Sequence, residues 1–331
     1  MVDVARPAPR STNWSALFGV VGALAALVVT LRLLDAADFA QIQNFLLVFS
    51  SLLVEAMPFI LLGAVVSAAI EVFVSARVFD RLAGLPRPLQ LPAAGMAGFA
   101  FPVCECGSVP VARRLASKGL APAAAITFML AAPILNPVVL ISTWVAYRGR
   151  DILLPMVVGR AVLGLIVAVA VGWVVSAHSK ADLLHEDVDE HSHEDAHPAK
   201  WRSFFGHLAG DFVFMGRYLV LGAAVAAALQ TFVPQSIIGS VAETPIVNLL
   251  AMMLLAFLLS LCSESDAFVA ASFVQFGVGA QLAFLVFGPM LDTKLSFLYA
   301  GTFSPRLLRT IVIVCAAVTL VGTMWIEVLF G

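Results

Sequence analysis

Apolar stretches of membrane-spanning length recur along the chain, separated by short polar segments. A helix rises about 1.5 Å per residue, so about 20 apolar residues cross a bilayer core of about 30 Å. Stretches of this kind cover 15–34, 44–74, 120–147, 152–177, 204–233, 281–300 and 306–329. The first is long for a signal peptide and lacks a small-residue cleavage site, which favours a retained helix. The pattern predicts an all-α, polytopic membrane protein.

Two further apolar regions fit poorly as single spans. Residues 90–103 are short, are interrupted by proline and glycine, and lead into the polar cluster 104–108. Residues 246–262 lead into a second polar cluster that ends at Asp266. We expect each region to be a broken helix or a re-entrant hairpin, because non-helical backbone at membrane depth survives only inside protein or beside a wet cavity.

Composition narrows the class of protein further. Hydrophobic residues make up 61% of the 331 residues and charged residues only 12%, against about 25% charged in soluble domains. The net charge of -2 gives no sign of nucleic-acid binding. No Walker A motif and no Rossmann glycine pattern is present. We therefore expect no enzyme activity, no cofactor and no nucleic-acid partner.

The basic residues predict the orientation in the membrane. With the N-terminus in the cytoplasm, 13 of the 19 Lys and Arg residues fall in cytoplasmic segments, three (Arg32, Arg148 and Arg150) fall outside, and three lie within spans. An excess of Lys and Arg marks the cytoplasmic side. The chain is thus expected in the plasma (inner) membrane as a multi-pass protein with a cytoplasmic N-terminus.

The two halves of the chain resemble each other. Residues 63–74 align with 222–233 at an offset of 159, with seven of twelve positions identical. Further on, an offset of 156 pairs Cys106 with Cys262 and Asn136 with Asp292. Each unit has an odd number of crossings, so the copies are expected to face opposite ways, as in many secondary transporters. The predicted divisions are 1–43 (tail and first helix), 44–177 (unit 1), 178–203 (linker) and 204–331 (unit 2).

Cys104, Glu105 and Cys106 are the most informative short motif. In an unwound segment, two thiols two residues apart can reach one soft metal or metalloid. Cys262 is the repeat partner of Cys106, so three thiols are candidates to converge on a solute. A buried cysteine is also a small hydrophobe, and that simpler interpretation is the one we adopt for Cys315.

Several intramembrane polar residues are further candidates, because ionisable groups at such depth are costly. Glu264, Asp266 and Asp292 are predicted to couple transport to a proton or cation. Asn136, between two prolines, is a predicted solute contact, and packing at a helix kink is the alternative explanation for it. Local pairing of Asp211 with Arg217, or of Asp292 with Lys294, is an alternative explanation for those groups.

The segment 178–203 is rich in histidine and acid and cannot form a core. A histidine-rich tract can bind divalent metals weakly. The candidate ligands are His185, His191, His193 and His197; a solvated acidic linker without metal is the alternative.

The motifs around the cysteines resemble a known family. Phe101–Leu115, with Cys104, Glu105 and Cys106, followed by Ala132–Pro137 and by Cys262–Ala270, is similar to the predicted permeases of the ArsP/YraQ type. The resemblance covers about 44 to 330. It implies an inner-membrane permease; some members export trivalent organoarsenicals, which bind thiols, and others are associated with metal homeostasis. It points to Cys104, Cys106 and Cys262.

Our first interpretation is a secondary transporter that exports a soft, thiol-binding solute. A zinc or other divalent-metal permease is the alternative, which the histidine-rich linker favours. A non-transporting membrane anchor subunit is a third reading, and a thiol-disulfide role is weaker because Cys-x-Cys is not the redox spacing. The expected partners are the lipid bilayer and a small solute or metal ion, with a homo-oligomer left open.

Overall fold

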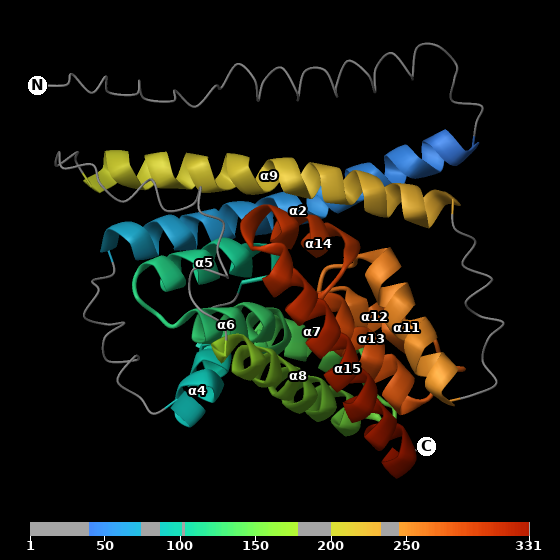
Figure 1. Cartoon of the computed structure of the whole chain (residues 1–331). Helices are drawn as coiled ribbons and strands as arrows, with labels where there is room; N and C mark the ends of the chain where they lie inside the picture. Colours follow the sequence, from blue (N-terminus) through green and yellow to red (C-terminus); the bar gives the residue numbers. More distant parts are fainter. Residues whose placement is uncertain (1–39, 74–86, 101–102, 178–199, 233–244, 331) are drawn as a thin grey trace, which may run out of the picture.

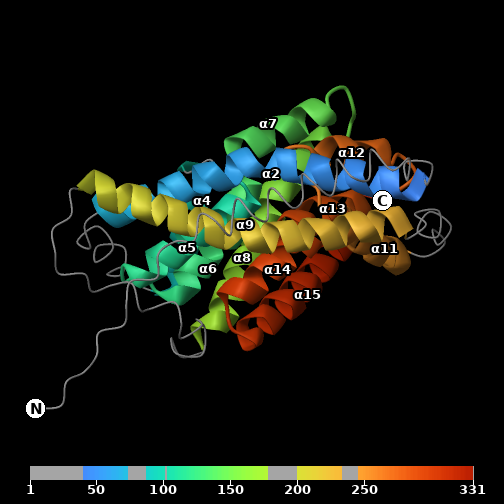
Figure 2. The same cartoon turned by 90° about the horizontal axis from the view of Figure 1, so that it is seen from above.

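The computed structural model of the chain describes residues 40–73, 87–100, 103–177, 200–232 and 245–330. Every regular element in these ranges is a helix. Figure 1 shows two long helices lying side by side across a bundle of shorter ones, and Figure 2 shows the same pair from above. The predicted helix 15–34 and the four histidines of the linker lie outside the described residues.

The helices follow one another in two comparable series. The first comprises α2 (Ala40–Phe73), α4 (Arg87–Ala100), α5 (Glu105–Ser117), α6 (Pro122–Leu135), α7 (Pro137–Ala146) and α8 (Leu153–Ser176). The second comprises α9 (Lys200–Phe232), α11 (Pro245–Leu259), α12 (Asp266–Ser272), α13 (Val278–Met290), α14 (Thr293–Thr302) and α15 (Pro305–Phe330). Every helix of the first series has a counterpart at the offsets of the sequence repeat.

The packing also follows the repeat. In the first series α4 and α8 pack against α6, and in the second α11 and α15 pack against α13. The counterparts α2 and α9 lie against each other and run in opposite directions (Figure 1). Antiparallel counterparts are the arrangement that an inverted repeat requires.

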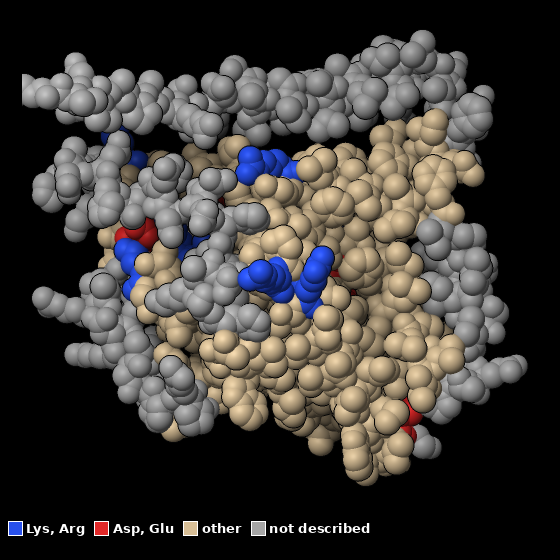
Figure 3. Space-filling view, viewed as in Figure 1, with Lys and Arg blue, Asp and Glu red and all other residues tan. Residues whose placement is uncertain are grey.

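Six stretches of the described residues are long and apolar enough to cross a membrane. They are Gln41–Phe73, Pro122–Ala146, Leu153–Ser176, Trp201–Phe232, Val278–Thr302 and Pro305–Leu329. Figure 3 shows a face on which the described charges form only a few small groups within a surface that is otherwise uncharged. The structure therefore confirms the all-α, polytopic membrane fold.

Two predicted spans are interrupted. The sequence pattern treats 120–147 and 281–300 as single helices, yet α6 ends at Leu135 before α7 begins at Pro137, and α13 ends at Met290 before α14 begins at Thr293. The breaks fall at Asn136 and Asp292, which are repeat counterparts. Hydropathy misses them because both halves of each span are apolar, whereas Pro137 removes a backbone donor and stops the first half.

Close contacts at two glycines of the long helices fix the starts of the short helices α5 and α14. A Cβ atom on Gly63 in α2 would lie 2.4 Å from the Cα of Gly107, in the first turn of α5. A Cβ atom on Gly222 in α9 would lie 2.8 Å from the Cα of Lys294, in the first turn of α14. Gly63 and Gly222 are repeat counterparts, so each long helix fixes the start of one half-helix through a small residue, as is common between membrane helices.

Candidate solute-binding site

The two thiols of the Cys-x-Cys motif lie at the beginning of α5. Cys104 is the N-cap residue, with extended backbone, and its sulfur accepts a hydrogen bond from the backbone N–H of Gly107 at 3.4 Å. The thiols of Cys104 and Cys106 lie close enough to interact with each other. Both are buried. The predicted break before Cys104 is thus present, although Pro110 lies inside α5 and does not end it.

Glu105 connects this break to the break of the second unit. It is fully buried, and its Oε2 accepts a hydrogen bond from Ser263 Oγ at 2.9 Å. Its Oε1 has no hydrogen-bond partner. Cys262, next to Ser263, lies close enough to interact electrostatically with Glu105 and Cys106. The structure therefore brings the polar residues of both interrupted segments to one buried place.

Lys294 and Asp292 border the same place from the start of α14. Asp292 is the N-cap residue, and its Oδ1 accepts from the backbone N–H of Leu295 at 2.6 Å. Its Oδ2 lies 3.9 Å from Lys294 Nζ, and neither atom has a hydrogen-bond partner. Lys294 is only 1% exposed and interacts electrostatically with Glu105, Cys106 and Cys262. The predicted pairing of Asp292 with Lys294 is present, but as a long contact.

A second buried ion pair lies beside this cluster. Arg160 of α8 donates to both carboxylate oxygens of Asp266, at 2.9 and 2.7 Å. It also donates to Thr143 Oγ1 at 2.9 Å and to the carbonyl oxygen of Ser263 at 3.2 Å. Charge-assisted bidentate pairs of this kind are strong and directional. Asp266 is therefore held by a partner 106 residues earlier in the chain, which sequence spacing could not reveal.

Asn136 and Glu264 are the remaining predicted polar residues. Asn136 caps α7, with its Oδ1 accepting from the backbone N–H of Val138 at 3.0 Å. Glu264 is half-buried, and one of its carboxylate oxygens has no hydrogen-bond partner. Within the described residues, neither side chain forms a hydrogen bond or an ion pair with the thiols, and their roles in transport stay predictions.

The predicted pairing of Asp211 with Arg217 is wrong. Asp211 accepts from Ser67 Oγ at 2.7 Å and from Arg114 at 3.4 Å. Arg217 lies instead over the rings of Phe214 and Tyr218, at 4.7 and 4.8 Å from their centroids. Residues six apart in a helix point to different faces, so a pairing within α9 was geometrically unfavourable.

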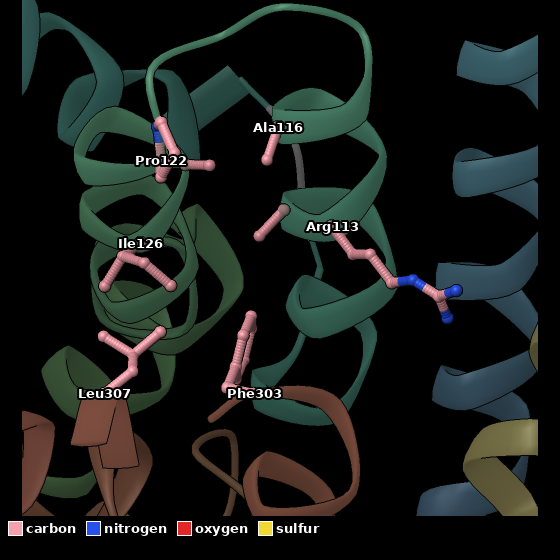
Figure 4. A pocket seen from close by; sticks show the side chains of 8 residues that line it. Arg113, Ala116, Pro122, Ile126, Phe303 and Leu307 are labelled. Atoms are coloured by element: carbon pink, nitrogen blue, oxygen red, sulfur yellow. The ribbon is translucent and has the colours of Figure 1, made fainter. Parts of the chain in front are cut away.

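A surface pocket elsewhere does not coincide with the cluster. Figure 4 shows it between α5, α6 and the segment around Phe303 and Leu307, with apolar side chains in its lining. The Arg113 guanidinium points away from it (Figure 4) and lies 5.3 Å from the centroid of the Phe214 ring. Within the described ranges, no three His, Cys, Asp or Glu side chains come close enough to hold a metal ion.

The fold and the buried cluster define a class of polytopic membrane proteins in which broken helices from two repeats meet around polar side chains. The chain belongs to a family of predicted permeases, whose model matches residues 41–328. The ArsP-type resemblance of the sequence motifs is thus confirmed.

Two curated relatives support the assignment. The chain is 37% identical over 296 residues to the UPF0718 protein YcgR of Bacillus subtilis, covering 88% of this chain and 98% of the relative. It is 35% identical over 274 residues to a Streptococcus mutans protein, covering 81% of this chain and 89% of the relative. The latter is provisionally named as a subunit of a two-component membrane permease complex. No solved structure matches the chain.

Proposed function

We propose that this permease is a secondary transporter that exports a soft, thiol-binding solute of the organoarsenical or metalloid kind from the cytoplasm. The observation that carries the proposal is the burial of Cys104 and Cys106 at the start of α5, with the buried Cys262 of the second unit near enough to interact electrostatically with Cys106. Soft centres prefer thiolate ligands to oxygen ligands. A hydroxyl-bearing soft centre exchanges one hydroxide for each cysteine sulfur that binds it, and that hydroxide leaves as water with the thiol proton.

In this transporter, the acidic residues Glu264, Asp266 and Asp292 couple export of the solute to movement of a proton or cation. Asp292 is the best placed, because one of its carboxylate oxygens has no hydrogen bond and lies beside Lys294. Asp266 is the most firmly held, because Arg160 occupies both of its oxygens. The proposed location is the plasma membrane, with the N-terminus in the cytoplasm.

A divalent-metal permease is the second candidate, favoured by the histidine-rich linker. The buried ammonium group of Lys294 weighs against it, because like charges in a low-dielectric site repel strongly. A membrane anchor for a partner subunit is the third candidate. The name of the Streptococcus mutans relative, a complex subunit, favours this candidate. The buried charges between broken helices argue against it, because such charges are costly and an anchor does not require them.

The double substitution Cys104→Ser with Cys106→Ser tests the thiol proposal. Serine is similar in size and exchanges the sulfur for a hard oxygen, so we expect normal abundance in the membrane and a loss of export. The measurement is uptake of phenylarsine oxide into inverted membrane vesicles. Cys315→Ser is the control, because Cys315 lies buried in α15 and is expected to have no role in binding.

Cys262→Ser extends the test. Loss of uptake with this variant supports binding by thiols of both units, whereas wild-type uptake restricts the thiol site to the first unit. Wild-type uptake by the double variant would mean that the thiols are not ligands.

A further inference from the structure

Three buried polar atoms at the starts of α5 and α14 lack a hydrogen-bond partner. They are Glu105 Oε1, Asp292 Oδ2 and Lys294 Nζ, on side chains that are at most 1% exposed. Buried polar atoms are nearly always satisfied, and an unsatisfied charged group is especially costly. Each of the three sits at the first turn or cap of a half-helix, where the backbone has been opened.

The adjacent ion pair makes a useful contrast. Arg160 and Asp266 form two hydrogen bonds of 2.9 and 2.7 Å, which is the geometry of a strong bidentate ion pair. Lys294 and Asp292, at 3.9 Å, stop short of hydrogen-bond distance. Gly222 contacts the backbone of Lys294 closely, so the start of α14 is held in place while Asp292 Oδ2 and Lys294 Nζ remain without a hydrogen bond.

These charged residues also break the repeat. The counterparts of Glu105 and Lys294 are Leu261 and Val138, and the counterpart of Asp292 is the neutral Asn136. The thiols Cys106 and Cys262, by contrast, are counterparts of each other. The three charged residues are therefore not part of the repeated pattern, and Glu105 of the first unit lies near enough to Asp292 and Lys294 of the second to interact with them electrostatically.

We propose that Glu105, Asp292 and Lys294 form a polar subsite beside the thiols that binds the hydroxyl groups which the transported solute has not exchanged for cysteine sulfur. The inference rests on the proposed function and adds the class of solute: a neutral molecule whose soft atom carries hydroxyl groups. Such hydroxyls donate to Glu105 and Asp292 and accept from Lys294, which offers three donors and no acceptor. A bare divalent cation could use the carboxylates but would meet the ammonium group.

Binding to the purified full chain in detergent tests the subsite. The probes are phenylarsine oxide, which is dihydroxylated in water, and Zn²⁺ alone. Lys294→Met keeps the length of the side chain and removes the donors, so we expect its affinity for phenylarsine oxide to fall about tenfold or more. Lys118→Met is the matched control, because Lys118 contacts Glu71 far along α5 from the thiols; its affinity should stay within about twofold.

Glu105→Gln gives an independent readout if the lysine variant folds poorly. It replaces one acceptor with a donor at constant size, and it should weaken binding of phenylarsine oxide to a similar extent. Unchanged affinity in either well-folded variant would overturn the subsite. So would tight Zn²⁺ binding to the wild type that Asp292→Asn or Glu105→Gln removes, since that result describes a cation site.

The outcomes separate the two proposals. If the Cys104→Ser, Cys106→Ser double variant binds phenylarsine oxide normally, the thiol function is wrong. If that variant loses binding while Lys294→Met retains it fully, only the polar subsite is wrong.

Discussion

At the scale of single residues, the sequence locates the thiols but not their charged neighbours. Proline and glycine around Cys104 predict an interrupted helix, and the repeat predicts that Cys262 belongs to the same site. The pairing of Asp266 with Arg160 depends on tertiary packing across 106 positions, and no local pattern encodes it. Lys294 could be recognised as a buried charge, but its missing hydrogen bonds appear only in three dimensions.

Arg160 should be essential for stability. Arg160→Met leaves the Asp266 carboxylate buried without its partner, and breaking a buried pair from one side costs about 3–5 kcal/mol. We expect a lower midpoint of thermal unfolding in detergent and reduced abundance in membranes. The double variant Arg160→Met with Asp266→Leu should recover much of the loss, because apolar replacements of a buried pair are often tolerated.

Arg217→Met is the control for that prediction. Arg217 is exposed and lies over aromatic rings, where a cation–π contact contributes about 0.5–1 kcal/mol. If Arg160→Met unfolds at the same temperature as the wild type, the buried pair does not stabilise the fold.

At the scale of elements, hydropathy finds the helices but not where they divide. The predicted 44–74, 152–177 and 306–329 correspond to α2, α8 and α15. The prolines around Asn136 indicate a kink, but hydropathy divides neither this span nor the one at Asp292, because a capped break between two apolar half-helices leaves the average hydropathy unchanged. Their caps, Asn136 and Asp292, were the available signal, since such side chains commonly cap helix N-termini.

The glycines at the helix crossings should not tolerate a side chain. Gly63→Ala places a methyl group against the backbone of Gly107, and Gly222→Ala does so against Lys294. Overpacking typically costs about 1–3 kcal/mol, so both variants should unfold at lower temperature and bind phenylarsine oxide more weakly.

Gly210→Ala serves as the comparison within α9. A Cβ atom on Gly210 meets nothing within 4 Å, and alanine is the better helix former by about 0.5–1 kcal/mol. Its stability should equal or exceed that of the wild type. Equal stability of Gly63→Ala and Gly210→Ala would show that the α2–α5 crossing can relax.

At the scale of the whole molecule, the repeat is the sequence feature that carries most information. It relates every helix of one series to a helix of the other, and α2 and α9 run antiparallel as an inverted arrangement requires. The orientation in the membrane is predicted from the distribution of Lys and Arg, because the packing of the helices is the same whichever side faces the cytoplasm.

Labelling of single cysteines in a cysteine-free background tests that orientation. A cysteine near the N-terminus and one in the segment 182–197 should both react with an impermeant maleimide only in inverted vesicles. Opposite accessibility of the two positions would contradict the inverted arrangement. Deleting 182–197 should leave membrane abundance and export intact, because its composition cannot support packing; loss of export with normal abundance would place the site elsewhere.

The burial of Asp292 and Lys294 has a consequence for biogenesis. Within Val278–Thr302, an apolar window of 18 residues has a mean hydropathy of 1.3, against 1.9 to 2.3 for the corresponding windows of the other five candidate spans. A charged residue at the centre of a helix costs about 2.5–3.5 kcal/mol on leaving the translocon. This stretch therefore partitions poorly into lipid by itself. We expect it to leave the translocon only together with α9, α11 and α15, which pack against it, so that its charges never face bare hydrocarbon.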